Sequence, residues 1–185
     1  MNELQQFCIL AKTQKSRACA ALIQQVISHR KIYVFGELLE QPSVQSLKDT
    51  EFTKSYNSLE LFAYGTLRDY LDNPDMYLDF SEVQLTKLKH LTLVSLAAKD
   101  KAISYEIMQR ELDISSVRAL EDLIIDAMYA GLLNGKMDPA GGIFRIKSVM
   151  ARDVKPGDIA ALIDMLTIWR ENMTTVGNNI KQGSA

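Results

Sequence analysis

The sequence predicts a mostly α-helical protein: a bundle of helical repeats, then a winged-helix subdomain, then one further long helix. Three observations predict this class. Apolar residues recur at steps of three and four along most of the 185 residues, an alternating run flanks a Pro-Ala-Gly-Gly turn, and a heptad-spaced segment follows it. We therefore expect helical repeats over residues 1–80, a winged helix over 81–155 and a bundle helix over 156–185.

The first half of the sequence predicts a series of helices. Amphipathic spacing predicts helices at 4–11 and 16–27, and shorter ones at 35–40 and 44–47.

A longer helix is predicted from Phe52 to Tyr70, where apolar side chains follow one another at steps of 4, 3, 4, 4 and 3. Gly65 lies inside this pattern, and a close helix–helix crossing would explain a glycine there. Asn73-Pro74-Asp75 is expected to end the helix, so the boundary between subdomains is placed at 73–80.

The second half has the order of elements typical of a winged helix. Ser81 and Gln84 form a capping-box pattern that opens a helix to residue 98. The elements expected after it are a strand at 102–104, a helix at 104–112, a helix at 116–133 ended by Asn134-Gly135, and strands at 136–138 and 143–149.

A last helix is expected to begin at Pro156 and to carry a heptad seam. Its apolar positions are Ile159, Leu162, Leu166, Trp169, Met173, Val176 and Ile180. The part from Met173 to Ile180 has no evident partner within the chain. We therefore expect Leu166, Trp169, Met173, Val176 and Ile180 to form a partly exposed apolar stripe that contacts another subunit.

Composition excludes several classes of protein. No apolar run approaches the ~20 residues that a membrane span needs, and the amino terminus lacks the pattern of a signal peptide. The two cysteines, Cys8 and Cys19, have no paired spacing. A reducing compartment is therefore expected, with both thiols acting as small core hydrophobes.

No residue pattern predicts a catalytic, cofactor or metal site. The two histidines, His29 and His90, lack metal-ligand spacing, and no phosphate-binding or nucleophile motif is present. Glu121, Asp122 and Asp126 lie on one predicted helix. They form either a solvated acidic face or a pair of catalytic carboxylates, and the second would need a pocket or a metal partner.

The net charge of −2 conceals opposed patches. Residues 4–36 hold five basic and no acidic side chains, which form either a basic helical face or a docking surface for an acidic partner. The helix at 116–133 has a charge of −2, whereas the wing at 134–155 has +3. The wing's candidate interaction residues are Lys136, Arg145, Lys147 and Arg152.

An acidic third helix does not suit the major groove of duplex DNA, because phosphate neutralisation supplies much of the affinity. An acidic face at Glu121, Asp122 and Asp126 beside a basic wing suits complementary protein surfaces instead. A winged helix that binds nucleic acid through Arg145, Lys147 and Arg152 remains the alternative.

Five segments carry a resemblance to a known family, at residues 34–39, 62–70, 87–92, 116–138 and 152–153. Together they span most of residues 7–170. The chain resembles the PCI-domain family, which includes subunits of the proteasome lid, the COP9 signalosome and a translation initiation factor complex. Within that family it looks most like the signalosome's subunit 7 proteins.

The resemblance implies a non-catalytic scaffold subunit of the cullin deneddylation complex, without a cofactor and located in the cytoplasm and nucleus. Its partners would be other PCI-type subunits and metalloprotease-type subunits. The wing would make lateral contacts and the last helix would join a common bundle. Family members usually continue into a charged tail, so the bundle helix is expected to be incomplete here. A proteasome-lid or initiation-factor subunit is the alternative within the same architecture.

Overall fold

The computed structural model describes residues 3–13 and 16–153. The chain divides into two compact units, Met1–Asp153 and Val154–Ala185, and the first unit is described below. The predicted bundle helix, with its seam at Leu166, Trp169, Met173, Val176 and Ile180, lies outside the described residues.

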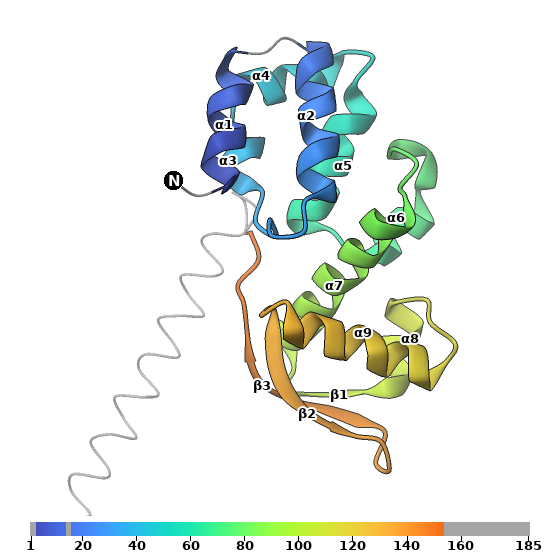
Figure 1. Ribbon diagram of the computed structural model, residues 1–185. Helices are drawn as coiled ribbons and strands as arrows, with labels where there is room; N and C mark the ends of the chain where they lie inside the picture. Colours follow the sequence, from blue (N-terminus) through green and yellow to red (C-terminus); the bar gives the residue numbers. More distant parts are fainter. Residues whose placement is uncertain (1–2, 14–15, 154–185) are drawn as a thin grey trace, which may run out of the picture. The chain divides into compact units, whose positions relative to one another are not determined.

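Helices build the first half of the unit (Figure 1). They are α1 (Glu3–Thr13), α2 (Ser16–Ser28), α3 (Gly36–Leu39), α4 (Pro42–Gln45), the 3-10 turn η1 (Ser46–Asp49), α5 (Thr53–Tyr64), α6 (Leu67–Asp72) and the 3-10 turn η2 (Pro74–Met76). Their apolar faces meet in one core, in which Phe62 makes edge-to-face contacts with Phe35 at 6.1 Å and Phe80 at 5.3 Å between ring centroids. Cys8 and Cys19 are buried in this core as small side chains, as expected.

The predicted continuous helix from Phe52 to Tyr70 is wrong. Helix α5 ends at Tyr64, Gly65 is extended (φ −90°, ψ −176°), and α6 begins afresh at Leu67. Thr66 and Asp69 form a capping box, in which the Thr66 amide donates to the Asp69 carboxylate at 2.9 Å. A side chain at Gly65 would meet Leu61 and Asp69 of the same segment, so no crossing helix explains the glycine.

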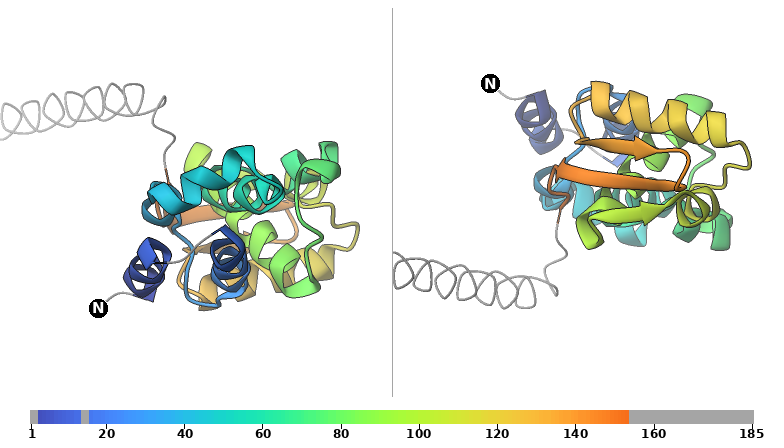
Figure 2. Two further views of the ribbon diagram at one scale, coloured as in Figure 1. Left: turned by 90° about the horizontal axis from the view of Figure 1, so that it is seen from above. Right: turned by 90° about the horizontal axis from the view of Figure 1, so that it is seen from below.

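The second half is a winged helix. It contains α7 (Glu82–Lys99), β1 (Ala102–Ser104), α8 (Tyr105–Glu111), α9 (Val117–Tyr129), β2 (Leu133–Asp138) and β3 (Ile143–Val149). The strands form an antiparallel sheet in the order β1-β3-β2, with α9 running alongside (Figure 2). The hydroxyls of Ser81, Ser104 and Ser116 each cap a helix, which confirms the predicted starts of α7, α8 and α9.

The predicted end of the third helix is four residues late. Helix α9 ends at Tyr129, and Gly131 reverses the chain with a left-handed φ of 77°. Asn134 and Gly135 belong to strand β2 instead of ending the helix. Gly135 is needed because a Cβ atom there would collide with the carbonyl oxygen of Arg145 on β3.

Helix α7 belongs to both halves. Leu88 and Leu91 pack in the core of the helical half, whereas Leu93 and Val94 pack with Phe144 in the core of the winged helix. The two cores therefore meet within α7, and the boundary predicted at 73–80 stays a prediction. None of the described helices combines the length and apolarity needed to cross a membrane.

Candidate protein-interaction site

The β2–β3 hairpin presents a basic surface. Lys136 on β2 pairs with Arg145 on β3, and Lys147 follows two residues later, so all three project from one face of the hairpin. All three are exposed, while Phe144 on the other face is fully buried. This surface, which we call the wing face, carries three adjacent positive charges that no described carboxylate pairs with in an ion pair.

The three acidic residues predicted on one helix do not share one environment. Asp122 and Asp126 are exposed and lie one turn apart on α9. Glu121 is half-buried and accepts a hydrogen bond from the Tyr105 hydroxyl at 3.4 Å. Burial and the Glu121 carboxylate together raise the pKa of Tyr105. The acidic face available to a partner is therefore Asp122 and Asp126.

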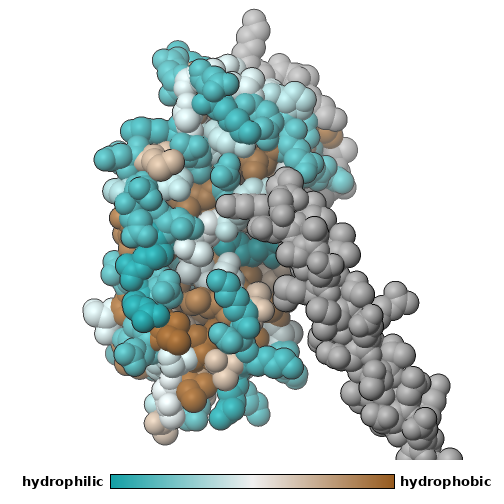
Figure 3. All heavy atoms as spheres, turned by 180° about the vertical axis from the view of Figure 1, so that it is seen from behind, coloured by the Kyte–Doolittle hydropathy of each residue, from teal (hydrophilic) through white to brown (hydrophobic). Residues whose placement is uncertain are grey.

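Apolar side chains also reach the surface of the winged helix. Viewed from behind, hydrophobic atoms gather over its lower part (Figure 3). Val117 at the start of α9 is 46% exposed and Tyr129 at its end is 89% exposed. Leu120 is the first buried residue of this helix. Exposed apolar residues beside charged ones are typical of protein interfaces.

Arg152 does not lie on the wing, where the sequence placed it. Its guanidinium enters the helical half and donates to the carbonyl oxygens of Gly65 at 2.7 Å and Phe62 at 2.8 Å, and to the Ser95 hydroxyl at 2.8 Å. Those carbonyls end α5, where a positive charge is favourable. Burial lowers the pKa of Arg152 to about 10, so the group remains a cation at neutral pH.

Asp153, the next residue, binds the start of a different helix. Its Oδ2 accepts the Phe35 amide at 2.6 Å, just before α3. A Cβ atom at Gly36 would lie 2.8 Å from Asp153 Oδ1, so a larger residue there would move the carboxylate. Burial raises the pKa of Asp153, and the hydrogen bonds from Phe35 and Gly36 act in the opposite direction.

Lys87 completes this group of buried charges. Its Nζ donates to the carbonyl oxygens of Val26 at 3.1 Å and His29 at 2.7 Å, at the end of α2, and lies 4.9 Å from the centroid of the Phe35 ring. Burial lowers the pKa of Lys87 to about 7. We call Lys87, Arg152 and Asp153 the polar junction, because each uses its charge to bind main-chain groups of the helical half.

The sequence pointed to the segments that contain Lys87, Arg152 and Asp153, but it did not predict the internal contacts that these three residues make. One signal was present: Lys87 occupies the same helical stripe as Leu91 and Val94, at steps of four and three, where an apolar residue is expected. A charged residue on a buried stripe predicts a satisfied internal contact. Within residues 3–13 and 16–153, no group of three or more His, Cys, Asp or Glu side chains is placed to hold a metal ion.

Comparison with known protein families agrees with both halves of the fold. Residues 5–36 match the CSN7 helical bundle subdomain, and residues 65–148 match the PCI domain. The second match covers α6 through nearly all of β3, and so contains the winged helix.

Individual relatives align over most of the chain. COP9 signalosome complex subunit 7 of Dictyostelium discoideum is 40% identical over 91% of this chain and 65% of its own length. Its namesake in Drosophila melanogaster is 39% identical over 96% of this chain and 64% of its own length. The chain thus spans just under two thirds of these relatives. Eukaryotic translation initiation factor 3 subunit M of Yarrowia lipolytica is 24% identical over 87% of this chain and 42% of its own length.

The structure thus contains a helical bundle and a winged helix that share helix α7. The two family matches follow the same order along the chain. Residues 65–148 are thus a PCI domain, and over most of its length the chain is similar to subunit 7 of the COP9 signalosome.

Proposed function

We propose that the chain is a non-catalytic scaffold subunit of the COP9 signalosome, the complex that deneddylates cullins. The observation that carries the proposal is the 40% identity to a signalosome subunit 7 across 91% of the chain, which spans both halves of the fold. The 24% identity to an initiation-factor subunit gives the alternative complex less support.

The division of charge within the unit supports a scaffold role. The polar junction binds its charged groups to main-chain atoms inside the protein, whereas the wing face and Asp122 and Asp126 are exposed on the winged helix. Opposite charges on neighbouring exposed surfaces suit contacts with two complementary partners. The proposed partners are other PCI-type subunits, met through the wing face, and metalloprotease-type subunits of the same complex.

The predicted seam at Leu166, Trp169, Met173, Val176 and Ile180 is proposed as the second contact. Its heptad spacing suits a helix that packs in a bundle with helices of other subunits. The proposed location of the whole assembly is the cytoplasm and nucleus.

The test is co-purification of the tagged full-length protein from its own cells, with its partners identified by mass spectrometry. Signalosome subunits should be recovered in near-equal amounts with the wild type. Charge reversal of the wing face (Lys136→Glu, Arg145→Glu and Lys147→Glu together) should reduce that recovery at least tenfold. Reversal of three exposed charges elsewhere, Lys48→Glu, Lys54→Glu and Lys99→Glu, is the control and should leave it unchanged. Recovery of proteasome-lid or initiation-factor subunits in their place would contradict the proposal.

The wing face also favours a second candidate, nucleic-acid binding. Three adjacent cations on one hairpin face suit a phosphate backbone, but Asp122 and Asp126 on α9 oppose the approach of a duplex. A gel shift that weakens with salt and disappears in the wing-face triple variant would support this function. Absence of binding at low salt would exclude it.

A further inference from the structure

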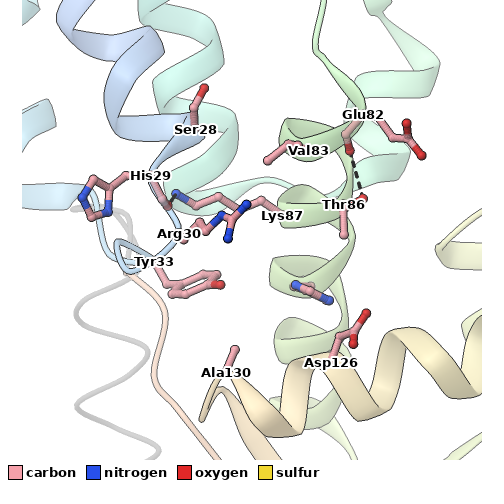
Figure 4. A pocket seen from close by; sticks show the side chains of 11 residues that line it. Ser28, His29, Arg30, Tyr33, Glu82, Val83, Thr86, Lys87, Asp126 and Ala130 are labelled. Carbon is pink, nitrogen blue, oxygen red and sulfur yellow. Dashed lines mark hydrogen bonds between the residues drawn. The ribbon is translucent and has the colours of Figure 1, made fainter.

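A cavity of about 650 Å³ lies between the end of α2, helix α7 and the end of α9. The side chains of Arg30 and Tyr33 form one wall and Asp126 reaches in from the facing wall, while Val83 projects from α7 (Figure 4). The size falls within the range of about 300–1,000 Å³ typical of ligand pockets. Of the residues that line this cavity, the proposed scaffold role uses only Asp126.

His90, which lines the cavity, has a nitrogen without a partner. The residue is 8% exposed, and among the described residues its Nε2 atom has no hydrogen-bond partner. Burial lowers the pKa of His90, which favours the neutral ring. A neutral ring that donates through its other nitrogen leaves Nε2 as an acceptor. A buried acceptor without a donor is unfavourable by about 1–3 kcal/mol.

The neighbouring polar groups identify the missing donor. Within the described part of the chain, the Asp126 carboxylate makes no hydrogen bond or ion pair, and its charge acts on His90. Two donors on α7 are engaged elsewhere: Lys87 Nζ binds Val26 and His29, and the Thr86 hydroxyl binds the Glu82 carbonyl. The unsatisfied groups beside α9 are therefore acceptors, one neutral and one negative.

We propose that this cavity binds a basic side chain of a partner polypeptide, with its charged end hydrogen-bonded to Asp126 and His90. An arginine fits best, because its planar group also stacks on an aromatic ring such as Tyr33 and donates in several directions. Arg30 on the opposite, exposed wall then faces the backbone carbonyl groups of the bound segment. The inference rests on the proposed role in assembly and adds the chemistry of one contact.

The test is an NMR titration of the ¹⁵N-labelled 185-residue protein with N-acetyl-arginine amide. The same titration uses N-acetyl-citrulline amide, which has the same shape but no charge. The His90 Nε2 resonance should move with the arginine compound, at an apparent affinity about tenfold higher than with the citrulline compound. Equal affinities for the two compounds would overturn the proposal. So would tighter binding of N-acetyl-glutamate amide, because Arg30 would then govern the site.

Two variants locate the contact. Asp126→Asn should weaken binding of the arginine compound about tenfold, whereas Asp122→Asn, one turn away on the same helix, should leave it unchanged. His90→Phe keeps a ring but removes the acceptor, and should weaken binding at least threefold when followed through the Val83 and Ala130 amides. Equal effects of the two aspartate variants would overturn the assignment.

The titration contains no other subunit, so its result is independent of co-purification. A protein that binds the arginine compound but recovers no signalosome subunits would contradict the proposed function alone. The opposite result would contradict the cavity proposal alone.

Discussion

Arg145 in the wing face and Arg152 in the polar junction carry the same guanidinium group and lie seven residues apart in the chain. Arg145 is exposed and pairs across the hairpin with Lys136, a group of like charge. Arg152 is largely buried and donates to carbonyl oxygens at the end of α5. The difference teaches that a charge on this chain either supports the fold or stays exposed at the surface, according to whether main-chain acceptors surround it.

The polar junction explains how the two halves of the unit are held together. After β3 leaves the wing, Arg152 binds the end of α5 and Asp153 binds the start of α3, while Lys87 binds the end of α2. Each charge lies at the helix end whose partial charge is opposite to its own. These contacts orient the winged helix against the helical half, so the surfaces offered to partners depend on them indirectly.

The largest expected effect comes from Arg152→Met. Removal of the guanidinium leaves buried carbonyl oxygens of Phe62 and Gly65 without donors, so we expect the free energy of unfolding to fall by about 3 kcal/mol. Urea denaturation of the 185-residue protein measures it. Arg145→Met is the matched control and should change it by less than about 0.5 kcal/mol. Equal losses for the two variants would remove the distinction between the regions.

A smaller loss is expected for Asp153→Ala. The variant removes the carboxylate that accepts the Phe35 amide, and loss of such a helix-capping group lowers the free energy of unfolding by about 1–2 kcal/mol. Gly36→Ala should act through the same bond, because its Cβ atom displaces Asp153 Oδ1. The double variant should therefore be about as stable as the less stable single variant. Additive losses would show that Gly36 acts independently of Asp153.

Local signals in the sequence predicted most of the elements correctly. The capping box at Ser81, the starts of α8 and α9 and the alternating run of β3 depend on neighbouring residues, and the structure has them where they were expected. The break at Gly65 was not predicted, because the apolar residues keep the same helical spacing on both sides of it. The Thr66-Asp69 capping box was the overlooked local evidence.

The polar junction could not be predicted in the same way. The acceptors of Arg152 lie 87 and 90 residues earlier in the chain, and no local pattern relates them. The sequence therefore assigned Arg152 to the wing by its neighbours, although its contacts are with the end of α5 and with Ser95 of α7. The cavity beside His90 was missed for the same reason, because its walls come from three separate helices.

Lys87 makes the polar junction sensitive to pH. Its pKa is about 7 in the folded protein and near 10.5 when unfolded, so the unfolded chain binds more protons between those values. Stability should therefore rise with pH through that window, by about 1 kcal/mol from pH 7 to 8. In Lys87→Met the free energy of unfolding should not rise in this way between pH 7 and 8. Urea denaturation of the wild type and the variant at each pH measures the difference. Lys89→Met, two residues away, should keep it.

The smallest expected effect has the opposite sign and tests the wing face. Lys136 lies directly across the hairpin from Arg145, and like charges in that position are unfavourable. Lys136→Glu should therefore raise the free energy of unfolding by about 0.5 kcal/mol at low salt, and the gain should shrink as salt screens the pair. Lys136→Gln, which removes the repulsion without adding an attraction, should give about half the gain.

The same substitution should weaken recovery of signalosome subunits, because it lowers the positive charge of the wing face. A variant that folds better and assembles worse separates the two uses of charge within one residue. A loss of stability in Lys136→Glu would instead mean that the wing cations support the fold, as Arg152 does. The contrast between the two regions would then rest on burial alone and not on what their charges bind.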